Sequence, residues 1–236
     1  MKKILYITAI LIFALSTVSF ASPATDYSQG KVAIDISIRP NMDLDFGGNK
    51  LDGKSSNPNL GVTIGLGNKM AFQYRNDAAD SKSYTFGGSV YGIAINGEIH
   101  GDFKAQEYNL LYKIDKNLTA LVGLTNAKGS LKASGTIGGQ PGSIDFSGKD
   151  SNGYQVGLIG TTKLAEKANA YGIISAGNKI TNYEVGVSYE FTKNAEFNLF
   201  YRDTTYKGIK VTYGGVDSPD FDYKAKGMGY GITYKF

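Results

Sequence analysis

The sequence predicts an all-β protein in which ten antiparallel strands, connected in chain order, close into an up-and-down barrel; eight or twelve strands are alternatives. The first observation is that apolar residues recur at every second position in ten separate segments, as in strands with one apolar and one polar face. The second is that short connections between these segments alternate with long polar ones. The 31 dispersed glycines and the absence of cysteine argue against collagen, helical bundles and disulfide scaffolds.

The first residues have the composition of a secretory signal peptide. Two lysines precede an apolar run over residues 4–20, and Ser19 and Ala21 are the small residues that a signal peptidase requires. We therefore expect residues 1–21 to be a signal peptide that is cleaved after Ala21, and residues 22–236 to form one exported domain. Beyond that run, no stretch approaches the roughly 18 consecutive apolar residues of a membrane-spanning helix.

Alternating segments then follow one another to the end of the chain. The first begins at Val32, and the last ends at Phe236. One segment alternates weakly, because Tyr171 and Ile173 fall on the face that should be polar. The predicted strands cover residues 32–38, 60–66, 70–74, 108–114, 118–124, 154–158, 168–176, 183–191, 195–201 and 228–236.

The connections between the predicted strands are of two kinds. Four have three residues, contain a lysine and preserve the apolar face across the turn: residues 67–69, 115–117, 165–167 and 192–194. The others are longer and polar, so one end of the barrel should carry short turns and the other long extracellular loops. These loops are expected at residues 40–59, 76–105, 126–152 and 203–223, with a shorter one near 177–181.

The composition of the two faces indicates which solvent each meets. The polar face carries mostly Gly, Thr, Ser, Asn and Gln, whereas the apolar face carries Val, Leu, Ile and aromatic residues without charges. A transmembrane barrel has this arrangement, with apolar residues toward lipid, polar residues inside and aromatic girdles at both interfaces. The predicted girdle residues are Phe72, Tyr74, Tyr108, Tyr112, Tyr154, Tyr183, Tyr189, Phe191, Phe197 and Tyr201.

The final segment, from Met228 to Phe236, ends in an aromatic residue that follows apolar residues at alternate positions. With the signal peptide and the alternating strands, it resembles a bacterial outer-membrane β-barrel protein and is most similar to small eight-to-ten-strand barrels such as opacity-type surface antigens. The resemblance implies the outer membrane of a Gram-negative cell, contact with its lipid and lipopolysaccharide, and recognition by the barrel-assembly machinery. The residues that match the assembly signal are Tyr230, Ile232, Tyr234 and Phe236.

Charged residues at inward positions predict the character of the lumen. Glu184 and Arg202 should form an ion pair, because they are equidistant from the turn at Lys193. Glu190 and Glu196 oppose each other, so we expect Lys235 or another cation near them, or a raised carboxyl pKa. The predicted lumen charges are Asp35, Arg39, Arg75, Glu107, Lys113, Glu184, Glu190, Glu196 and Arg202.

The residues offer little for catalysis or metal binding. The single histidine, His100, is expected on an exposed loop, so a lipid-modifying barrel enzyme is a remote alternative. The segment from Asp43 begins like a calcium loop but has Lys54 where glutamate is required. We expect no enzyme, no cofactor and no metal, and a net charge of +4 without a basic block argues against nucleic-acid binding.

The sequence therefore predicts an integral outer-membrane barrel that displays surface loops. Because a ten-strand barrel lies near the size that side chains fill, and its five acidic and four basic lumen residues nearly cancel, we expect a largely plugged lumen. A structural, adhesive or surface-antigen role follows, with an unknown ligand for the loops. A narrow porin for ions or small polar solutes is the alternative.

Overall fold

The computed structural model describes residues 26–55, 58–90 and 93–236, and the predicted signal peptide over residues 1–21 lies outside them. Among the described residues, no helix is long and apolar enough to cross a membrane. The strands are β1 (Val32–Ile38), β2 (Met42–Phe46), β3 (Asn49–Lys54), β4 (Asn59–Gly67), β5 (Met70–Ser81), β6 (Tyr84–Val90), β7 (Ile93–Lys113), β8 (Leu118–Ile137), β9 (Gln140–Lys149), β10 (Ser151–Ala165), β11 (Ala168–Gly177), β12 (Ile180–Thr192), β13 (Ala195–Tyr213), β14 (Val216–Asp217) and β15 (Phe221–Lys235).

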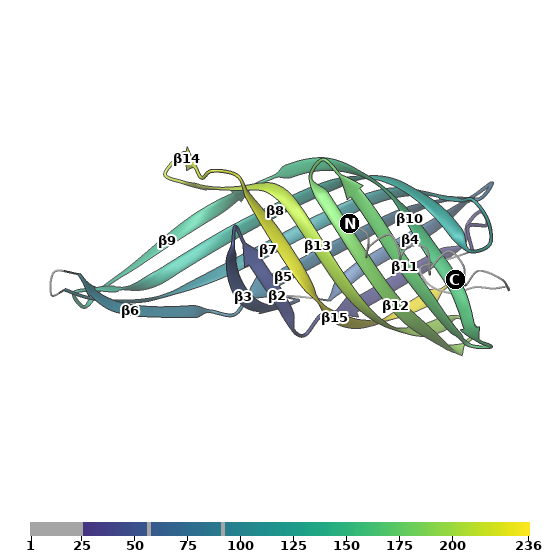
Figure 1. Ribbon diagram of the computed structural model, residues 1–236, viewed down its shortest axis with the longest axis horizontal. Helices are drawn as coiled ribbons and strands as arrows, with labels where there is room; N and C mark the ends of the chain where they lie inside the picture. Colours follow the sequence, from purple (N-terminus) through teal and green to yellow (C-terminus); the bar gives the residue numbers. More distant parts are fainter. Residues whose placement is uncertain (1–25, 56–57, 91–92) are drawn as a thin grey trace, which may run out of the picture.

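Hydrogen bonding between the first and last strands closes the sheet into a barrel (Figure 1). β1 pairs with β4 on one side and with β15 on the other. From β4, antiparallel pairings lead through β5, β7, β8, β10, β11, β12 and β13 to β15, so ten described strands form one ring. Closure satisfies backbone groups that an open sheet would leave unpaired. The predicted all-β, closed, antiparallel up-and-down barrel is confirmed.

The two faces of each strand differ as the alternation predicts. On β8, the outward side chains of Val122 and Leu124 are 51% and 64% exposed, whereas the inward Thr125 is 3% exposed. On β11, the strand with the weakest alternation, Tyr171 and Ile173 are buried on the inward face. The barrel therefore has an apolar outer surface and a mostly polar interior, with a few larger apolar side chains inside.

At one end, several strands continue past the ring as long hairpins, with β6 and β9 reaching furthest (Figure 1). β7 and β8 keep one register from Lys113 opposite Thr119 to Ile95 opposite Ile137. β6 pairs with the outer part of β7, and β9 pairs with the outer part of β8. The prediction of loops was therefore wrong in form, because backbone pairing continues beyond the point where the outward face of the strands stops being apolar. Strands take up much of the predicted loops at 40–59, 76–105, 126–152 and 203–223.

Charged side chains link these hairpins on their exposed surface. Lys149 Nζ on β9 lies 2.7 Å from Asp217 Oδ2 on β14, and Thr212 also donates a hydrogen bond to Asp217. The hydrogen bond from Lys149, followed by that from Thr212, lowers the pKa of Asp217 from its usual value. Asp217 therefore remains an anion, and an acceptor for both donors, at neutral pH.

A short hairpin, β2–β3, takes the place of β1 and β4 at the same end. β15 pairs with β1 through residues 230–235 and then with β2 through residues 223–226, while the end of β3 pairs with β5. Met42, Leu44 and Phe46 of β2 are buried in one apolar cluster with inward side chains of the barrel. The hairpin thus extends the wall and fills the interior at the end that bears the extensions.

Candidate functional site: a charged network across the lumen

The predicted lumen charges all lie at inward-facing positions, but their side chains are buried to different extents. Five side chains are at most 5% exposed: Arg39, Glu107, Glu184, Glu196 and Arg202. Four are half-buried: Asp35, Arg75, Lys113 and Glu190.

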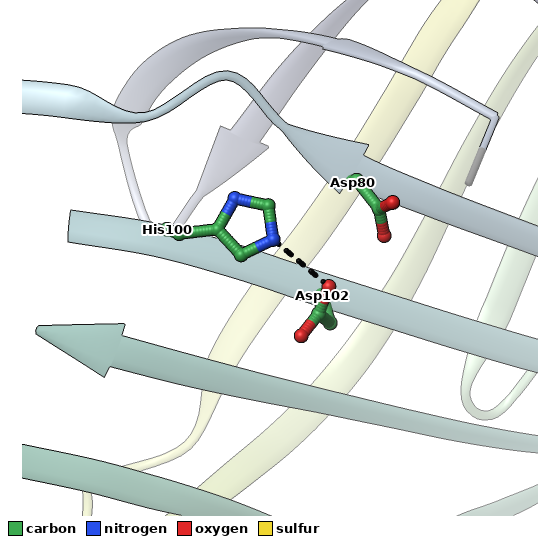
Figure 2. Close-up of side chains that lie close together, drawn as sticks. All are labelled: Asp80, His100 and Asp102. Carbon is green, nitrogen blue, oxygen red and sulfur yellow. Dashed lines mark hydrogen bonds and ion pairs between the residues drawn. The ribbon is translucent and has the colours of Figure 1, made fainter.

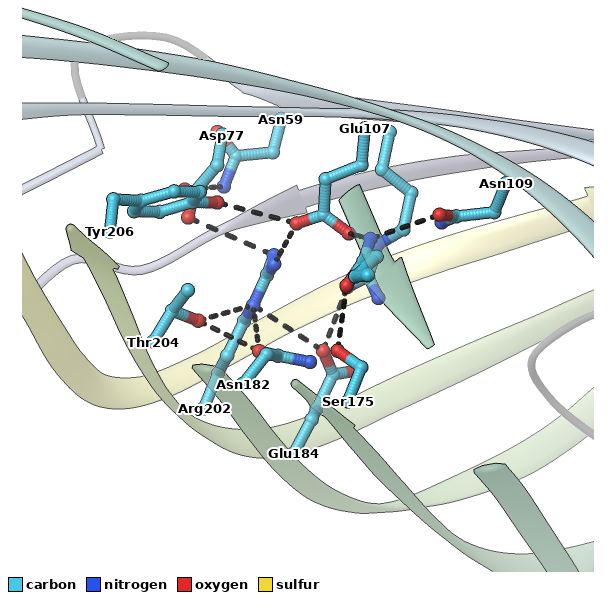
Figure 3. Close-up of polar contacts among 12 residues, drawn as sticks. Asn59, Asp77, Glu107, Asn109, Ser175, Asn182, Glu184, Arg202, Thr204 and Tyr206 are labelled. Carbon is cyan, nitrogen blue, oxygen red and sulfur yellow. Dashed lines mark hydrogen bonds and ion pairs between the residues drawn. The ribbon is translucent and has the colours of Figure 1, made fainter. Parts of the chain in front are cut away.

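Arg202 on β13 is the centre of the network (Figure 3). Its Nη2 donates to Glu107 Oε1 on β7 at 2.5 Å. Its Nη1 lies 3.7 Å from Asp77 Oδ2 on β5, and its Nε lies 3.7 Å from Glu184 Oε2 on β12. One guanidinium group therefore contacts carboxylates from three other strands.

The two other arginines of the chain complete the network. Arg39 Nη2 contacts both carboxylate oxygens of Asp77, at 2.5 and 2.7 Å. Arg75 Nη2 donates to Glu184 Oε2 at 2.7 Å, closer than the predicted partner of Glu184, Arg202. Three guanidinium groups thus meet three carboxylates, and their charges cancel locally.

Two of the short ion pairs join opposite walls of the barrel. In the ring, β13 follows β7 by five strands, and β12 follows β5 by five strands. In a ring of ten, strands that are five apart face each other across the lumen. The contacts of Arg202 with Glu107 and of Arg75 with Glu184 therefore cross the lumen.

Neutral polar side chains satisfy the remaining atoms of the central charges. Glu107 accepts hydrogen bonds from Tyr206 Oη at 3.3 Å and Gln155 Nε2 at 3.2 Å. Arg202 Nε donates to Asn182 Oδ1 at 2.9 Å and to Thr204 Oγ1 at 3.0 Å. Buried charges are tolerated when they are paired and hydrogen-bonded in this way, so the network is a fixed part of the interior.

An apolar layer covers the network at the end that bears the extensions. Phe103 stacks on Tyr223 with ring centroids 3.7 Å apart, and Phe46 of the β2–β3 hairpin contacts the edge of Tyr223. Tyr206 belongs to both layers, because its ring packs on Phe103 while its hydroxyl reaches Glu107. The lumen is thus filled by charged contacts and, beyond them, by packed aromatic side chains.

At the short-turn end, a lysine meets the predicted pair of opposed glutamates. Glu190 and Glu196 are direct cross-strand partners, and Lys235 Nζ lies 2.8 Å from Glu196 Oε2. This agrees with the hypothesis that Lys235 is the nearby cation. Asp35 accepts a short hydrogen bond from Thr233.

The space left within the lumen is small. This holds around the charged network, whereas a larger cavity of about 700 Å³ opens at the short-turn end beside Lys113 and Lys235. At the network, a cavity of about 70 Å³ is lined by Asp35, Arg75, Glu184 and neighbouring side chains. Since a water molecule in the liquid occupies about 30 Å³, this volume holds about two waters. It is far smaller than the sites that bind small organic ligands, which take roughly 300–1,000 Å³.

Sequence reasoning missed Asp77, the carboxylate shared by Arg39 and Arg202. It ended the predicted strand at Tyr74 and assigned residues 76–105 to a loop. Asp77 lies two positions beyond Arg75, so it occupies the same face of β5, which continues to Ser81. The available signal was this parity, but it was obscured because no large apolar side chains follow Tyr74 on the outward face of β5.

The predicted girdle residues and assembly-signal residues all lie on the outer face. Tyr74 is half-buried, and the others are at least 38% exposed. The girdle comprises Phe72, Tyr74, Tyr108, Tyr112, Tyr154, Tyr183, Tyr189, Phe191, Phe197 and Tyr201; the terminal set comprises Tyr230, Ile232, Tyr234 and Phe236.

His100 was wrongly assigned to a loop. It lies within β7, two residues before Asp102 on the same outward face, and both side chains are about one-third exposed. The strand persists there because β7 pairs with β8 along this whole stretch, with His100 opposite Lys132.

Comparison with solved structures identifies the class of the fold. The crystal structure of the outer membrane protease OmpT from Escherichia coli matches with a TM-score of 0.55 and 15% identity, over 94% of this chain and 99% of that chain. The protein has the fold of an outer-membrane β-barrel. At this identity the likeness to OmpT shows the fold alone, and the barrel resembles small outer-membrane barrels at the level of their class.

Two further solved structures align with the barrel at lower scores. Ail, the attachment invasion locus protein of Yersinia pestis, has a TM-score of 0.42 and 16% identity over 88% of this chain and 99% of that chain. Neisserial surface protein A has a TM-score of 0.34 and 14% identity over 87% of this chain and 96% of that chain. A scan against protein-family models and a comparison with curated proteins both find no match.

Proposed function

We propose that this outer-membrane barrel is a non-enzymatic surface protein with a closed lumen, and that its strand extensions serve a structural, adhesive or surface-antigen role. The observation that carries the proposal is the pair of ion contacts across the lumen, Arg202 with Glu107 and Arg75 with Glu184. Each joins facing strands, and each involves a carboxylate that is at most 5% exposed.

The energetics of these contacts favour a plug over a gate. An ion pair gains more from Coulomb attraction in a poorly solvated interior than in water, and separating it leaves two charges that must be solvated. Both contacts across the lumen, Arg202 with Glu107 and Arg75 with Glu184, would have to separate for a solute to pass. The cluster of Phe46, Phe103 and Tyr223 would also have to move. A narrow porin would need a second arrangement of these residues.

The extensions supply a surface for contact with a partner. Their outer parts carry apolar side chains that are 41% to 62% exposed, in a region of otherwise polar strands. Exposed apolar residues on a rigid scaffold suit adhesion or recognition better than catalysis in a water-excluding pocket. The residues are Tyr84, Phe86, Ile93, Ile137 and Ile144.

Conductance across a planar lipid bilayer tests the closed lumen. The wild-type barrel and the double variant Arg75→Ala/Arg202→Ala are inserted after circular dichroism has verified their folding. The matched control is Lys224→Ala/Lys226→Ala, which removes two lysines from half-exposed pairs with Asp203 and Asp43. We expect currents from the arginine variant alone, because only that variant removes contacts across the lumen.

The opposite result would establish the alternative. Discrete channels from the folded wild type, enlarged or made more cation-preferring by the arginine substitutions, would show that the barrel is a narrow porin. Silence from both the wild type and the arginine variant would mean that the apolar layer closes the lumen without the charges.

The enzyme alternative has a separate test. OmpT is an outer membrane protease, but its likeness to the barrel concerns the fold alone. His100 is the single histidine of the chain, so the variant His100→Ala removes every imidazole. We expect unchanged lipid A modification in cells that carry this variant; a changed pattern would revive the lipid-modifying enzyme.

The proposed partners follow from the outer face. The exposed apolar side chains should contact the lipid and lipopolysaccharide of the outer membrane. The resemblance of the last strand to an assembly signal leads us to propose that the barrel-assembly machinery reads Tyr230, Ile232, Tyr234 and Phe236. The extensions would bind a further partner at the cell surface, whose identity is unknown.

A further inference from the structure

Three side chains with metal-binding atoms meet on the outer face of the strand extensions (Figure 2). Asp80 lies on β5, and His100 and Asp102 lie on β7. Asp80 and Asp102 are direct cross-strand partners, and His100 is two residues from Asp102 on the same face. The network across the lumen does not include these residues.

The backbone holds the three residues firmly. β5 and β7 keep one register from Met70 opposite Tyr112 to Asp80 opposite Asp102. On its other edge, β7 is paired with β8 through the same stretch. A site on two adjacent paired strands is positioned more precisely than a site on a loop, so little ordering is needed when an ion binds.

The distances suit a small divalent ion. His100 Nε2 lies 3.1 Å from Asp102 Oδ1, and one ligand atom from each of the three residues lies within 4.8 Å of the others. Zinc binds imidazole nitrogen and carboxylate oxygen at about 2.0–2.2 Å, so the edge of a tetrahedral site is roughly 3.3 Å. His100 and Asp102 already span one such edge, and a rotation of the Asp80 side chain would supply the third ligand.

The charges around the three residues favour a cation between them. Carboxylates directly opposite each other on adjacent strands repel, as Asp80 and Asp102 do here. On the flanking strands, Lys54 lies opposite Asp80 and Lys132 lies opposite His100. These lysines offset part of the negative charge from the sides, whereas a divalent ion would lie between the two carboxylates and use the imidazole as well.

The cluster also has access to water. The side chains of His100 and Asp102 are 33% and 31% exposed. On the outward face of β7, they lie beyond Gln106 and Lys104, on the far side from Tyr108 of the aromatic girdle. An ion held there could keep one coordination position open to the solution outside the cell.

We propose that Asp80, His100 and Asp102 form a binding site for a divalent transition-metal ion of the zinc class. The mixed nitrogen and oxygen ligands favour zinc and its neighbours over calcium and magnesium, which prefer oxygen ligands alone. Three protein ligands leave the fourth position for water or for a group on a surface partner. The site would give the extensions a metal-dependent contact, which departs from the sequence-based expectation of no metal.

Zinc titration of the refolded mature barrel, prepared without a histidine tag, tests this site. Because the chain has one histidine, nitrogen-15 labelling of histidine gives an NMR signal from His100 alone. We expect one equivalent of zinc to shift that signal, and calorimetry to give the same stoichiometry. Excess calcium or magnesium should not displace the zinc.

Three single variants identify the ligands. His100→Gln, Asp80→Asn and Asp102→Asn should each weaken zinc binding about tenfold or more, because even residues that only support a ligand typically contribute 10–100-fold. The control Asp217→Asn removes a carboxylate from a different hairpin and should leave zinc binding unchanged. Circular dichroism of each variant verifies that the barrel is folded.

Four results would overturn the proposal. They are no saturable zinc binding by the folded wild type, a zinc affinity that survives all three substitutions, a loss confined to His100→Gln, and displacement of zinc by equimolar calcium. The third result would reduce the site to a lone surface histidine, and the fourth would show a site for hard cations.

Discussion

At the scale of single residues, the interior depends on three arginines. The chain contains no others, and all three lie in the lumen network. Arginine suits this position because its planar group donates to several carboxylates at once and stays charged when buried. Arg202 shows this most clearly, since Asp77, Glu107 and Glu184 all lie within 4 Å of its guanidinium group.

Replacing Arg202 by methionine should therefore destabilise the barrel strongly. The variant leaves the buried carboxylate of Glu107 without its ion pair, and removing one partner of a buried pair typically costs about 3–5 kcal/mol. The double variant Arg202→Met/Glu107→Leu should recover part of this loss, because it removes the stranded charge. Urea unfolding in lipid vesicles measures the free energy of unfolding of each variant.

An exposed pair provides the comparison for this prediction. Lys224 Nζ lies 3.3 Å from Asp203 Oδ2, and the lysine side chain is 42% exposed. Lys224→Met should change the free energy of unfolding by about 0–1 kcal/mol, as exposed pairs usually do. Equal losses from Arg202→Met and Lys224→Met would contradict a special role for the buried network.

At the scale of elements, the membrane-facing strands were predictable and their extensions were not. The apolar belt is the part of the barrel in which the outward side chains are apolar. There, lipid on one side and a polar lumen on the other impose strict alternation, and Val122, Leu124 and Thr125 follow it. Outside the belt, both faces of a strand can be polar, so β6 and β9 looked like loops. The position of Asp77 in the network depends on the register of the strands in these extensions. So does the approach of Asp80 to His100, and the hydropathy pattern does not specify that register. Glu190 opposite Glu196 was predictable because the short turn between β12 and β13 fixes their register.

The tip of the β6–β7 hairpin should be dispensable for folding. β6 pairs with β7 alone and lies outside the ring, and Tyr84 is directly opposite Ile99. Replacing residues 85–98 by Asn-Gly would join these two positions with the turn that two-residue hairpins favour. We expect a folded barrel, with a free energy of unfolding within about 1 kcal/mol of wild type, because the ring loses only the outermost pairings of β7 with β8, those of residues 95–98.

The same deletion separates folding from the proposed surface role. It removes Phe86 and Ile93, which are among the exposed apolar side chains of the extensions. Cells that display the shortened protein should adhere less to a hydrophobic surface than cells that display equal amounts of the wild type. Failure of the shortened protein to fold would show instead that the extension supports the barrel.

At the scale of the whole molecule, position along the barrel axis determines what each outward residue meets. Outward side chains on β8 are apolar at Val122 and Leu124 but change to Asn126, Lys128 and Lys132 further along the strand. The end with short turns and the apolar belt should therefore lie in the membrane, and the polar extensions should stand outside it. Without this division, the metal site proposed at His100 would be buried in lipid.

Arginine substitutions along β8 should map this division. Val122→Arg places a charge on the lipid face near the centre of the belt, where arginine typically costs about 2–4 kcal/mol, whereas the same charge near an interface costs about 0–1 kcal/mol. Ser134→Arg, on the same outward face but in the extension, should leave the free energy of unfolding in vesicles nearly unchanged, because that side chain is exposed to water.

A third variant, Thr125→Arg, places the charge inside the barrel, where Thr125 is 3% exposed, and should destabilise the barrel through crowding. Thinner bilayers should reduce the cost of Val122→Arg but not that of Thr125→Arg, since only the first side chain meets lipid. Equal costs for Val122→Arg and Ser134→Arg would mean that the bilayer extends over the hairpins, which the charges on their outer face make unfavourable.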